Sequence, residues 1–222
     1  MTESLSGLGR RYEWDKRNLD YKLPRRAVAR DLRRRMWWAG QVLDQGATPQ
    51  CVGYAGWGWL AAGPITNPPK FTPTELYHWA QERDEWPGKD YEGSSSLGLM
   101  RALKDKGYIS EYRWALDVQT MIAWVLTTGP VVVGTNWYLD MFTPDRRGYI
   151  RPTGENVGGH EWGIVGADKD RVDMQGDKGA FRMVNTWGRG WAEKGRAWVS
   201  FKSMEFLLGE EGDCTTATEI KL

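Results

Sequence analysis

The change of sequence pattern at Gly129-Pro130 constrains the fold of this chain more than any other feature. After it, short segments rich in β-branched and aromatic residues predict strands over 131–137, 160–167, 181–187 and 196–201. Helices followed by strands favour an α+β fold, in which a helical lobe packs against a mostly antiparallel sheet or open barrel with a cleft between them. The helices predicted before the change are an apolar stretch over 51–62, a helix from the capping box Thr72-Pro73-Thr74-Glu75 to about Glu85, one opened by Ser94 or Ser95 that ends at Gly107, and one from Asp117 to Gly129.

The length of 222 residues fits one large domain or two tightly joined lobes. Within it we distinguish a basic N-terminal leader over 1–40 that crosses onto the fold, a mainly helical lobe over 41–129 and a mainly β lobe over 130–222. The leader contains the run RRAVARDLRRR, from Arg25 to Arg35. Such a run could contact phosphate, but a solvated segment is its more common meaning.

The overall charge does not single out a partner. Thirty Lys and Arg residues against 29 Asp and Glu leave a net charge of +1, so no long-range field directs the molecule to nucleic acid or to an anionic membrane. The N-terminus lacks the apolar stretch of a secretory signal, and no run approaches the ~20 apolar residues of a membrane span. We therefore expect a soluble protein made in a reducing compartment.

Only two cysteines and two histidines are available for chemistry. They show no spacing typical of a zinc site, and the sequence has no phosphate-binding loop, so we expect neither a metal nor a cofactor. A cysteine nucleophile with a histidine base is the remaining combination. His78 is expected on a helix surface, Cys214 as a free structural or exposed thiol, and the carboxylates Glu82, Asp84 and Glu85 on a solvated helix face.

Cys51 stands at the start of the first predicted helix, where the positive end of the helix dipole lowers the pKa of a thiol and favours the nucleophilic thiolate. A buried, inert thiol is the alternative. Gln45 lies in the preceding loop, and its amide could donate to a developing oxyanion beside the backbone N–H of Cys51. An ordinary surface amide is the alternative for Gln45.

His160 and Asn185 are the corresponding candidates in the β half. His160 follows Gly158-Gly159 at the start of a predicted strand, where it could face a cleft as the base for a thiol. The Asn185 carbonyl could orient the imidazole ring, and Trp187 could shield that hydrogen bond from water. A structural histidine and a turn-capping asparagine are the alternatives.

Together, the segments DQGATPQC, GGHEWGIVGAD and VNTWGRGWAEKGRAWVSF resemble the papain-like cysteine peptidases in order and internal spacing, over about residues 30–201. The resemblance implies a two-lobe fold with a central helix that starts at the nucleophile and a lobe similar to an antiparallel β-barrel. It implies Cys51 as the nucleophile, His160 as the base, Asn185 as the residue that orients it and Gln45 as the oxyanion donor. Substrate would then contact Gly158, Gly159 and Trp187, and the loop over 91–98 would help to shape selectivity.

The sequence departs from the family pattern at several positions. Val52 replaces the usual Trp after the nucleophile, and Thr48 replaces a cysteine of secreted members, so their disulfide cannot form. Glu161 follows the histidine where a small residue is usual; its carboxylate could raise the pKa of the imidazole or bind a basic group of the substrate. The short segment before the Gln45 loop resembles the leader of bacterial and viral relatives, with Leu32-Arg33 where the domain begins.

The resemblance predicts a cysteine peptidase that hydrolyses peptide or isopeptide bonds. Two alternatives stay open: a catalytically quiet papain-like scaffold, for example in a virion or another complex, and an acyltransferase that passes the same thioester to an amine. The expected partner is a polypeptide substrate, with a protein complex or virion as a further one and neither nucleic acid nor a membrane. The expected location is cytoplasmic or virion-associated.

Overall fold

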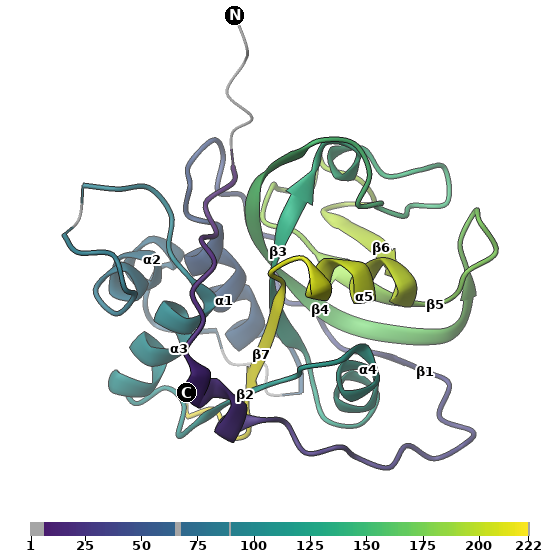
Figure 1. The fold of residues 1–222 in the computed structure, drawn as a ribbon, viewed down its shortest axis with the longest axis horizontal. Helices are drawn as coiled ribbons and strands as arrows, with labels where there is room; N and C mark the ends of the chain where they lie inside the picture. The colour runs from purple at the N-terminus through teal and green to yellow at the C-terminus, as the bar shows by residue number, and fades with distance from the viewer. Residues whose placement is uncertain (1–6, 65–67, 89, 222) are drawn as a thin grey trace, which may run out of the picture.

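A helical lobe and a sheet lobe lie side by side in the computed structural model, which describes residues 7–64, 68–88 and 90–221 (Figure 1). This arrangement confirms the α+β class expected from the change of pattern. The helical lobe contains α1 (Cys51–Ala61), α2 (Pro73–Gln81) and α3 (Ser96–Asp105). The other helices are α4 (Val118–Thr127), α5 (Phe201–Gly209) and the short 3-10 helices η1 (Lys16–Tyr21) and η2 (Leu139–Phe142).

One antiparallel sheet forms most of the second lobe. Its strands follow the order β2-β7-β3-β4-β5-β6, and β1 pairs with β4 outside this path. Because the path has two ends, β2 and β6, the sheet is open and not a closed barrel. The strands are β1 (Arg34–Met36), β2 (Tyr112–Trp114), β3 (Val131–Tyr138), β4 (Asn156–Val172), β5 (Lys178–Val184), β6 (Arg196–Ser200) and β7 (Asp213–Ala217).

Side chains that bind free backbone N–H groups set the starts of the helices. Thr72 caps α2: its hydroxyl accepts a hydrogen bond from the Glu75 N–H, and the Glu75 carboxylate accepts one from the Thr72 N–H. Ser95 and Asp117 cap α3 and α4 through the N–H groups of residues 98 and 120. No helix in the described ranges is long and apolar enough to cross a membrane.

The end of α2 differs from the prediction. The helix ends at Gln81, so Glu82, Asp84 and Glu85 lie in the turn that follows it and not on a solvated helix face. The Asp84 carboxylate accepts hydrogen bonds from two hydroxyl groups of the next loop, at 2.6 and 2.7 Å. These bonds hold the turned chain in place of a further helical turn.

Strand boundaries also differ from the prediction near the candidate site. β4 begins at Asn156, so His160 lies inside a strand and not at its start. β5 ends at Val184, which leaves Asn185 and Trp187 just beyond the strand. Residue 201 begins α5 instead of ending a strand. His160 is therefore held within β4, whereas Asn185 and Trp187 follow the end of β5.

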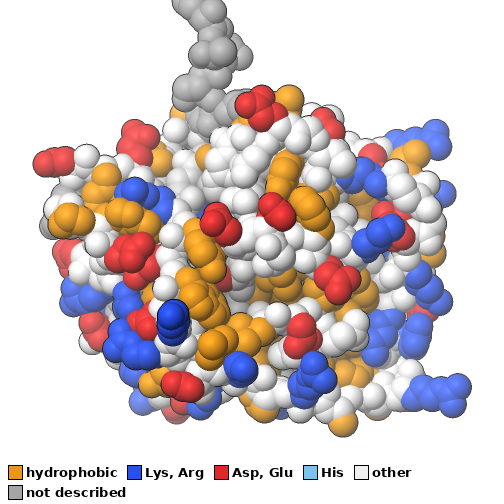
Figure 2. Space-filling model, viewed as in Figure 1, with side chains coloured by type: hydrophobic (Ala, Val, Ile, Leu, Met, Phe, Trp, Pro, Cys, Tyr) orange, Lys and Arg blue, Asp and Glu red, His pale blue; other side chains and the backbone are white. Residues whose placement is uncertain are grey.

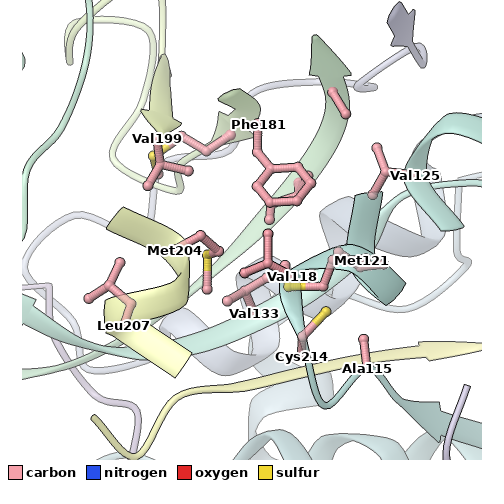
Figure 3. Packing of buried hydrophobic residues seen from close by; sticks show 14 of the residues in the cluster. Ala115, Val118, Met121, Val125, Val133, Phe181, Val199, Met204, Leu207 and Cys214 are labelled. Atoms are coloured by element: carbon pink, nitrogen blue, oxygen red, sulfur yellow. The ribbon is translucent and has the colours of Figure 1, made fainter. Parts of the chain in front are cut away.

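Buried hydrophobic residues form a core between the sheet and the helices that cover it (Figure 3). Val118 and Met121 from α4 and Met204 from α5 pack against side chains of β3, β5 and β6. Cys214 from β7 belongs to the same core and is a buried free thiol, 1% exposed. A second cluster packs α1 against α2, α3 and Val132 of β3, so α1 is held between its own lobe and the sheet.

The basic run Arg25–Arg35 crosses the surface mostly exposed, and its last residues form the start of β1. Arg33 binds Asp170 with a shortest N–O distance of 2.7 Å, and Arg34 lies 3.6 Å from Asp168. These ion pairs connect the run to β4. They agree with a solvated segment that is attached to the fold along its length.

Gly53 allows α1 to approach α2 closely, because a Cβ at this position would lie 2.3 Å from the Pro73 carbonyl oxygen and 2.6 Å from the Tyr77 Cβ. We expect Gly53→Ala to lower the free energy of unfolding by about 1–3 kcal/mol, measured by urea denaturation. Gly58→Ala is the matched control in the same helix, since its Cβ would meet only Leu43, at 3.9 Å. That variant should gain up to about 1 kcal/mol from helix propensity; equal effects of both variants would contradict this account of the packing.

Candidate active site

Cys51 is the first residue of α1 and is completely buried. The backbone N–H groups of Val52 and of Glu161, which lies on β4, are close enough to its sulfur to lower the pKa of the thiol in part, against the larger effect of burial. The helix therefore delivers the thiol across the boundary between the lobes, to the residue that follows His160. The first N–H groups of a helix have no partner within the helix, so this end of α1 can also donate to an oxygen atom.

His160 is fixed by Asn185, and both side chains are completely buried. His160 Nε2 lies 2.7 Å from Asn185 Oδ1. The backbone N–H of Thr186 donates to the same Oδ1 at 2.7 Å, which identifies that atom as an acceptor. Nε2 must therefore carry the imidazole hydrogen. The other ring nitrogen, Nδ1, is buried without a hydrogen-bond partner within the described part of the chain, and its lone pair is available to accept a proton.

Two tryptophans enclose the imidazole ring. Trp187 stacks on it with ring centroids 4.6 Å apart and an interplanar angle of 27°. Trp137 from β3 meets it edge-on, with centroids 4.9 Å apart. The rings keep water from the bond between His160 and Asn185 and restrict rotation of the imidazole. The sequence predicted the position of Trp187, whereas nothing in the local sequence distinguished Trp137 from other strand residues.

The side-chain amide of Gln45 donates hydrogen bonds to backbone carbonyl oxygens in the structure. Its Oε1 accepts a hydrogen bond from the Thr186 hydroxyl, which fixes the orientation of the amide. Nε2 donates to the Thr48 oxygen at 2.6 Å and to the Gly7 oxygen at 3.2 Å, and the Trp187 indole donates to the same Gly7 oxygen at 3.3 Å. The amide is thus not a free surface group. The contribution of Thr186 was not foreseen, although this residue stands inside the N-T-W-G motif.

The N-terminal residues Gly7–Tyr12, called the cleft segment below, run between the two lobes as the purple start of the chain in Figure 1. The backbone N–H groups of Gly9 and Arg10 both donate to the Gly159 oxygen at 3.0 Å. On the other side, the Arg11 N–H donates to the Ser94 oxygen at 2.7 Å. The cleft segment is therefore bound to both walls of the boundary between the lobes.

The glycines predicted to contact substrate contact the cleft segment in this structure. A Cβ on Gly159 would lie 2.2 Å from the Arg10 carbonyl oxygen, and one on Gly158 would lie 3.1 Å from the Leu8 side chain. Only a residue without a side chain permits the approach at Gly159. Because the cleft segment occupies this space, the structure shows the site in a covered state, in which Cys51 has no contact with solvent.

Burial sets the protonation of the site in this covered state. It raises the pKa of Cys51 to about 12 and lowers the pKa of His160 to about 4, because charged groups lose hydration there. Both groups are neutral at pH 7. The expectation that the helix start lowers the pKa of Cys51 is wrong for this state, since the loss of hydration outweighs the helix dipole.

The expected effect of Glu161 on the imidazole also differs. Successive residues of a strand point to opposite faces, so the Glu161 carboxylate points away from His160, and its Oε2 lies 2.9 Å from the Ser96 hydroxyl. Burial therefore controls the pKa of His160, with a smaller opposing effect of the bond to Asn185. The carboxylate remains available for the other role considered from the sequence, contact with a basic group.

The remaining candidate residues lie elsewhere. His78 is exposed on α2, as expected, and its Nδ1 lies 3.1 Å from Gln81 Oε1. Cys214 is enclosed in the sheet core. In residues 7–64, 68–88 and 90–221, no three His, Cys, Asp or Glu side chains lie together in a way that could hold a metal ion.

Comparison with solved structures identifies the architecture. Xylellain, a cysteine protease from Xylella fastidiosa, matches with a TM-score of 0.70 and 16% identity over 97% of each chain. The chain has a papain-like cysteine protease fold. The procathepsin B S9 of Trypanosoma congolense matches 99% of this chain and 85% of its own, with a TM-score of 0.61 and 13% identity. Bromelain from Ananas comosus matches 81% and 94%, with a TM-score of 0.59 and 15% identity.

The similarity is one of fold and not of overall sequence. No protein-family model matches this chain, and no curated protein matches it with significance. The papain-like fold agrees with a central helix that starts at Cys51 and with a sheet that carries His160. The roles of these side chains rest on their own chemistry.

Proposed function

We propose that the protein is a cysteine peptidase that hydrolyses peptide or isopeptide bonds in a polypeptide substrate. The state of the His160 ring carries the proposal: Nε2 is committed to Asn185, and Nδ1 is buried without a partner among the described residues. A buried polar atom without a hydrogen bond is costly and calls for an explanation. Service as the base for the Cys51 thiol provides one, because the backbone N–H of Glu161, the residue after His160, is close enough to the Cys51 sulfur to lower the pKa of its thiol.

The reaction would proceed in two steps once the cleft segment has moved away. In the first, His160 Nδ1 takes the proton of the Cys51 thiol while the sulfur attacks the carbonyl carbon of the substrate. The C–N bond then breaks, the imidazolium returns its proton to the leaving amine, and a thioester remains on Cys51. In the second, His160 takes a proton from water while the water oxygen attacks the thioester carbonyl carbon. The C–S bond then breaks, the imidazolium returns its proton to the Cys51 sulfur, and the acid product leaves.

Gln45 would stabilise the oxyanion of both steps together with the Cys51 N–H. Its Nε2 already binds a carbonyl oxygen, that of Gly7, and the Thr186 hydroxyl fixes its orientation. Asn185 would act through His160 by keeping Nε2 protonated and the ring in position. No step requires a metal or a cofactor.

The test is cleavage of a peptide library by the full-length protein, followed by mass spectrometry of the products. New peptide termini that appear with the wild type and not with Cys51→Ala would support a peptidase. An added amine distinguishes the acyltransferase alternative, because aminolysis would then replace hydrolysis in the products. A complete lack of products would favour a catalytically quiet scaffold, for which the burial of Cys51 is the structural argument.

Gln45→Ala should lower kcat about 10²-fold, because it removes one donor to the oxyanion. KM should change much less, since this donor acts mainly in the transition state. Gln41→Ala is the matched control, an exposed glutamine in the same loop that should retain normal turnover. Steady-state kinetics with a fluorogenic peptide measure both variants. Unchanged turnover of Gln45→Ala would remove Gln45 from the mechanism.

A further inference from the structure

Four elements of the fold enclose an acidic cluster on the face of β4 opposite to the His160 side chain. The charge of Glu161 in this cluster affects the pKa of the Cys51 thiol, so the cluster lies near the proposed nucleophile. Its carboxylates belong to Glu161 on β4 and Asp213 at the start of β7, which are 0% and 4% exposed. Ser96, at the start of α3, lies between them and contacts both Glu161 Oε2 and Asp213 Oδ1 through its hydroxyl oxygen. Gly134 on β3 leaves room, since a Cβ there would lie 2.6 Å from Glu161 Oε2. We call these four residues the acid pocket.

The side chain of Arg10, from the cleft segment, fills the acid pocket. Its Nη2 donates to Asp213 Oδ2 and to the Glu211 carbonyl oxygen, both at 2.6 Å, and only 1% of the side chain is exposed. A Cβ on residue 134 would also lie 2.7 Å from the Arg10 Nε. The guanidinium group suits this pocket, because its fixed fork of donors can reach two acceptors at once.

The charges of the acid pocket call for one cation. The Ser96 hydroxyl has a single hydrogen but contacts one oxygen of each carboxyl group, so one carboxyl must supply the second hydrogen. Burial, together with the nearby charge of Asp213, raises the pKa of Glu161 well above its ordinary value. The Arg10 guanidinium balances the charge of the Asp213 carboxylate in this pocket. Without a guanidinium, that charge would be buried and unpaired.

Main-chain hydrogen bonds hold the backbone of the cleft segment. A peptide could make the same bonds if it has glycine at the place of Gly9, because a Cβ there would lie 2.1 Å from the Pro49 carbonyl oxygen. Arg10 lies between two hydrogen bonds with Ser94, in which the Arg11 N–H donates to the Ser94 oxygen and the Ser94 N–H donates to the Gly9 oxygen. Gly159 accepts bonds on the opposite side. Such main-chain bonds provide affinity, while pockets for side chains provide specificity. The guanidinium in the acid pocket is a side-chain contact of the second kind.

We propose that the acid pocket selects an arginine of the polypeptide substrate close to the bond that is cleaved, and that Asp213 and Glu161 determine this specificity. Arg10 occupies the position that the substrate arginine takes. This inference rests on the proposed peptidase function for its place in catalysis, but the selection of arginine is a binding property that can be measured separately. On the face shown in Figure 2, acidic side chains are scattered over the middle of the molecule, while most Lys and Arg side chains lie toward its sides and lower part.

The binding test uses the full-length double variant Arg10→Ala/Cys51→Ala, in which the pocket is vacated and cleavage is prevented. The probes are labelled Ala-based hexapeptides with one Arg at each position after the first in turn, directly preceded by Gly as Arg10 is, and matched sets with Leu or Glu in place of the Arg. We expect the best Arg peptide to bind at least about tenfold more tightly than its Leu and Glu counterparts, measured by fluorescence anisotropy. The variant that retains Arg10 should bind the same peptide more weakly, because its pocket is occupied.

Adding Asp213→Asn to the double variant should remove the preference for Arg, so that Arg and Leu peptides bind alike. This change removes a carboxylate whose guanidinium partner is already absent, and it therefore leaves no new unpaired charge in the fold. Glu155→Gln is the matched control for charge, because Glu155 is exposed in the turn before β4. Thermal unfolding of each variant checks the fold. If Asp213→Asn does not fold, Ser96→Ala tests the same pocket and should weaken the preference.

Equal affinity for Arg, Leu and Glu peptides at every position would overturn the proposal, as would a preference for Arg that survives Asp213→Asn. Kinetics with Arg10→Ala provide the second arm: the same Arg peptides should show a kcat/KM at least about tenfold above the Leu peptides. Absence of all cleavage together with selective Arg binding would contradict the peptidase function and leave the pocket supported. Cleavage without selection of Arg would support the peptidase function and contradict the proposed role of the acid pocket.

Discussion

Replacement of Cys51 by alanine should reduce peptide hydrolysis by at least about 10⁴-fold, the largest effect expected from any substitution in this chain. The sulfur is the attacking atom and the carrier of the acyl group, so neither step can proceed through it once it is removed. Water attack assisted by the remaining groups would be the only residual route. Steady-state kinetics should be measured in the wild type and in Arg10→Ala, so that the covered state does not hide the loss.

Cys214→Ala is the control that the chain itself offers. Both cysteines are free and buried, and both substitutions remove one sulfur atom. Cys214 belongs to the core of the sheet lobe, so its replacement should lower stability while kcat changes less than about threefold. Similar loss of activity in both variants would indicate damage to the fold and not loss of the nucleophile, and hydrolysis by Cys51→Ala at the wild-type rate would exclude the mechanism.

The parts of the fold that the sequence predicted well are those set by local contacts. The capping box at Thr72 and the caps at Ser95 and Asp117 involve residues within three positions of each other, so short-range patterns identify them. The predicted end of α2 was wrong because the Asp84 carboxylate accepts hydrogen bonds from hydroxyl groups of the following loop. The strand patterns did not give the pairing of β1 with β4 or the open path of the sheet, which depend on long-range pairing.

The candidate site shows the same division. The motifs predicted that Asn185 orients the His160 ring, and the two side chains are in hydrogen-bond contact in the structure. The cleft segment was not foreseen, because backbone groups make most of its contacts and any residue carries those. The period of two in a strand could have shown that Glu161 points away from the face that His160 occupies. The direction in which the pKa of Cys51 shifts depends on its complete burial, which the position of a residue in a helix does not reveal.

Alkylation of Cys51 by iodoacetamide at neutral pH should be about 10³-fold faster in Arg10→Ala than in the wild type. Arg10 and Asp213 form an ion pair with 1% and 2% of their side chains exposed. Removal of one partner of a buried pair costs about 3–5 kcal/mol, because the other charge stays buried alone. That cost falls on the covered state, in which the carboxylate has no water around it. A change of about 4 kcal/mol corresponds to roughly 10³-fold more of the uncovered state.

The rate of Cys51 alkylation should depend on pH differently in the wild type and in Arg10→Ala. In the covered state the pKa of Cys51 is about 12, because burial disfavours the thiolate, so wild-type alkylation should still rise with pH above pH 10. In Arg10→Ala the sulfur regains water at the start of α1, its pKa falls toward or below the ordinary value of about 8.5, and the rate should level off there.

Mass spectrometry of the two cysteine peptides measures each rate, with Cys214 as the internal standard, since its labelling should not respond to residue 10. Arg17→Ala, which removes an exposed ion pair with Asp15, should behave as the wild type does. Equal rates and equal pH profiles in all three proteins would show that Arg10 does not hold the cleft segment over the thiol.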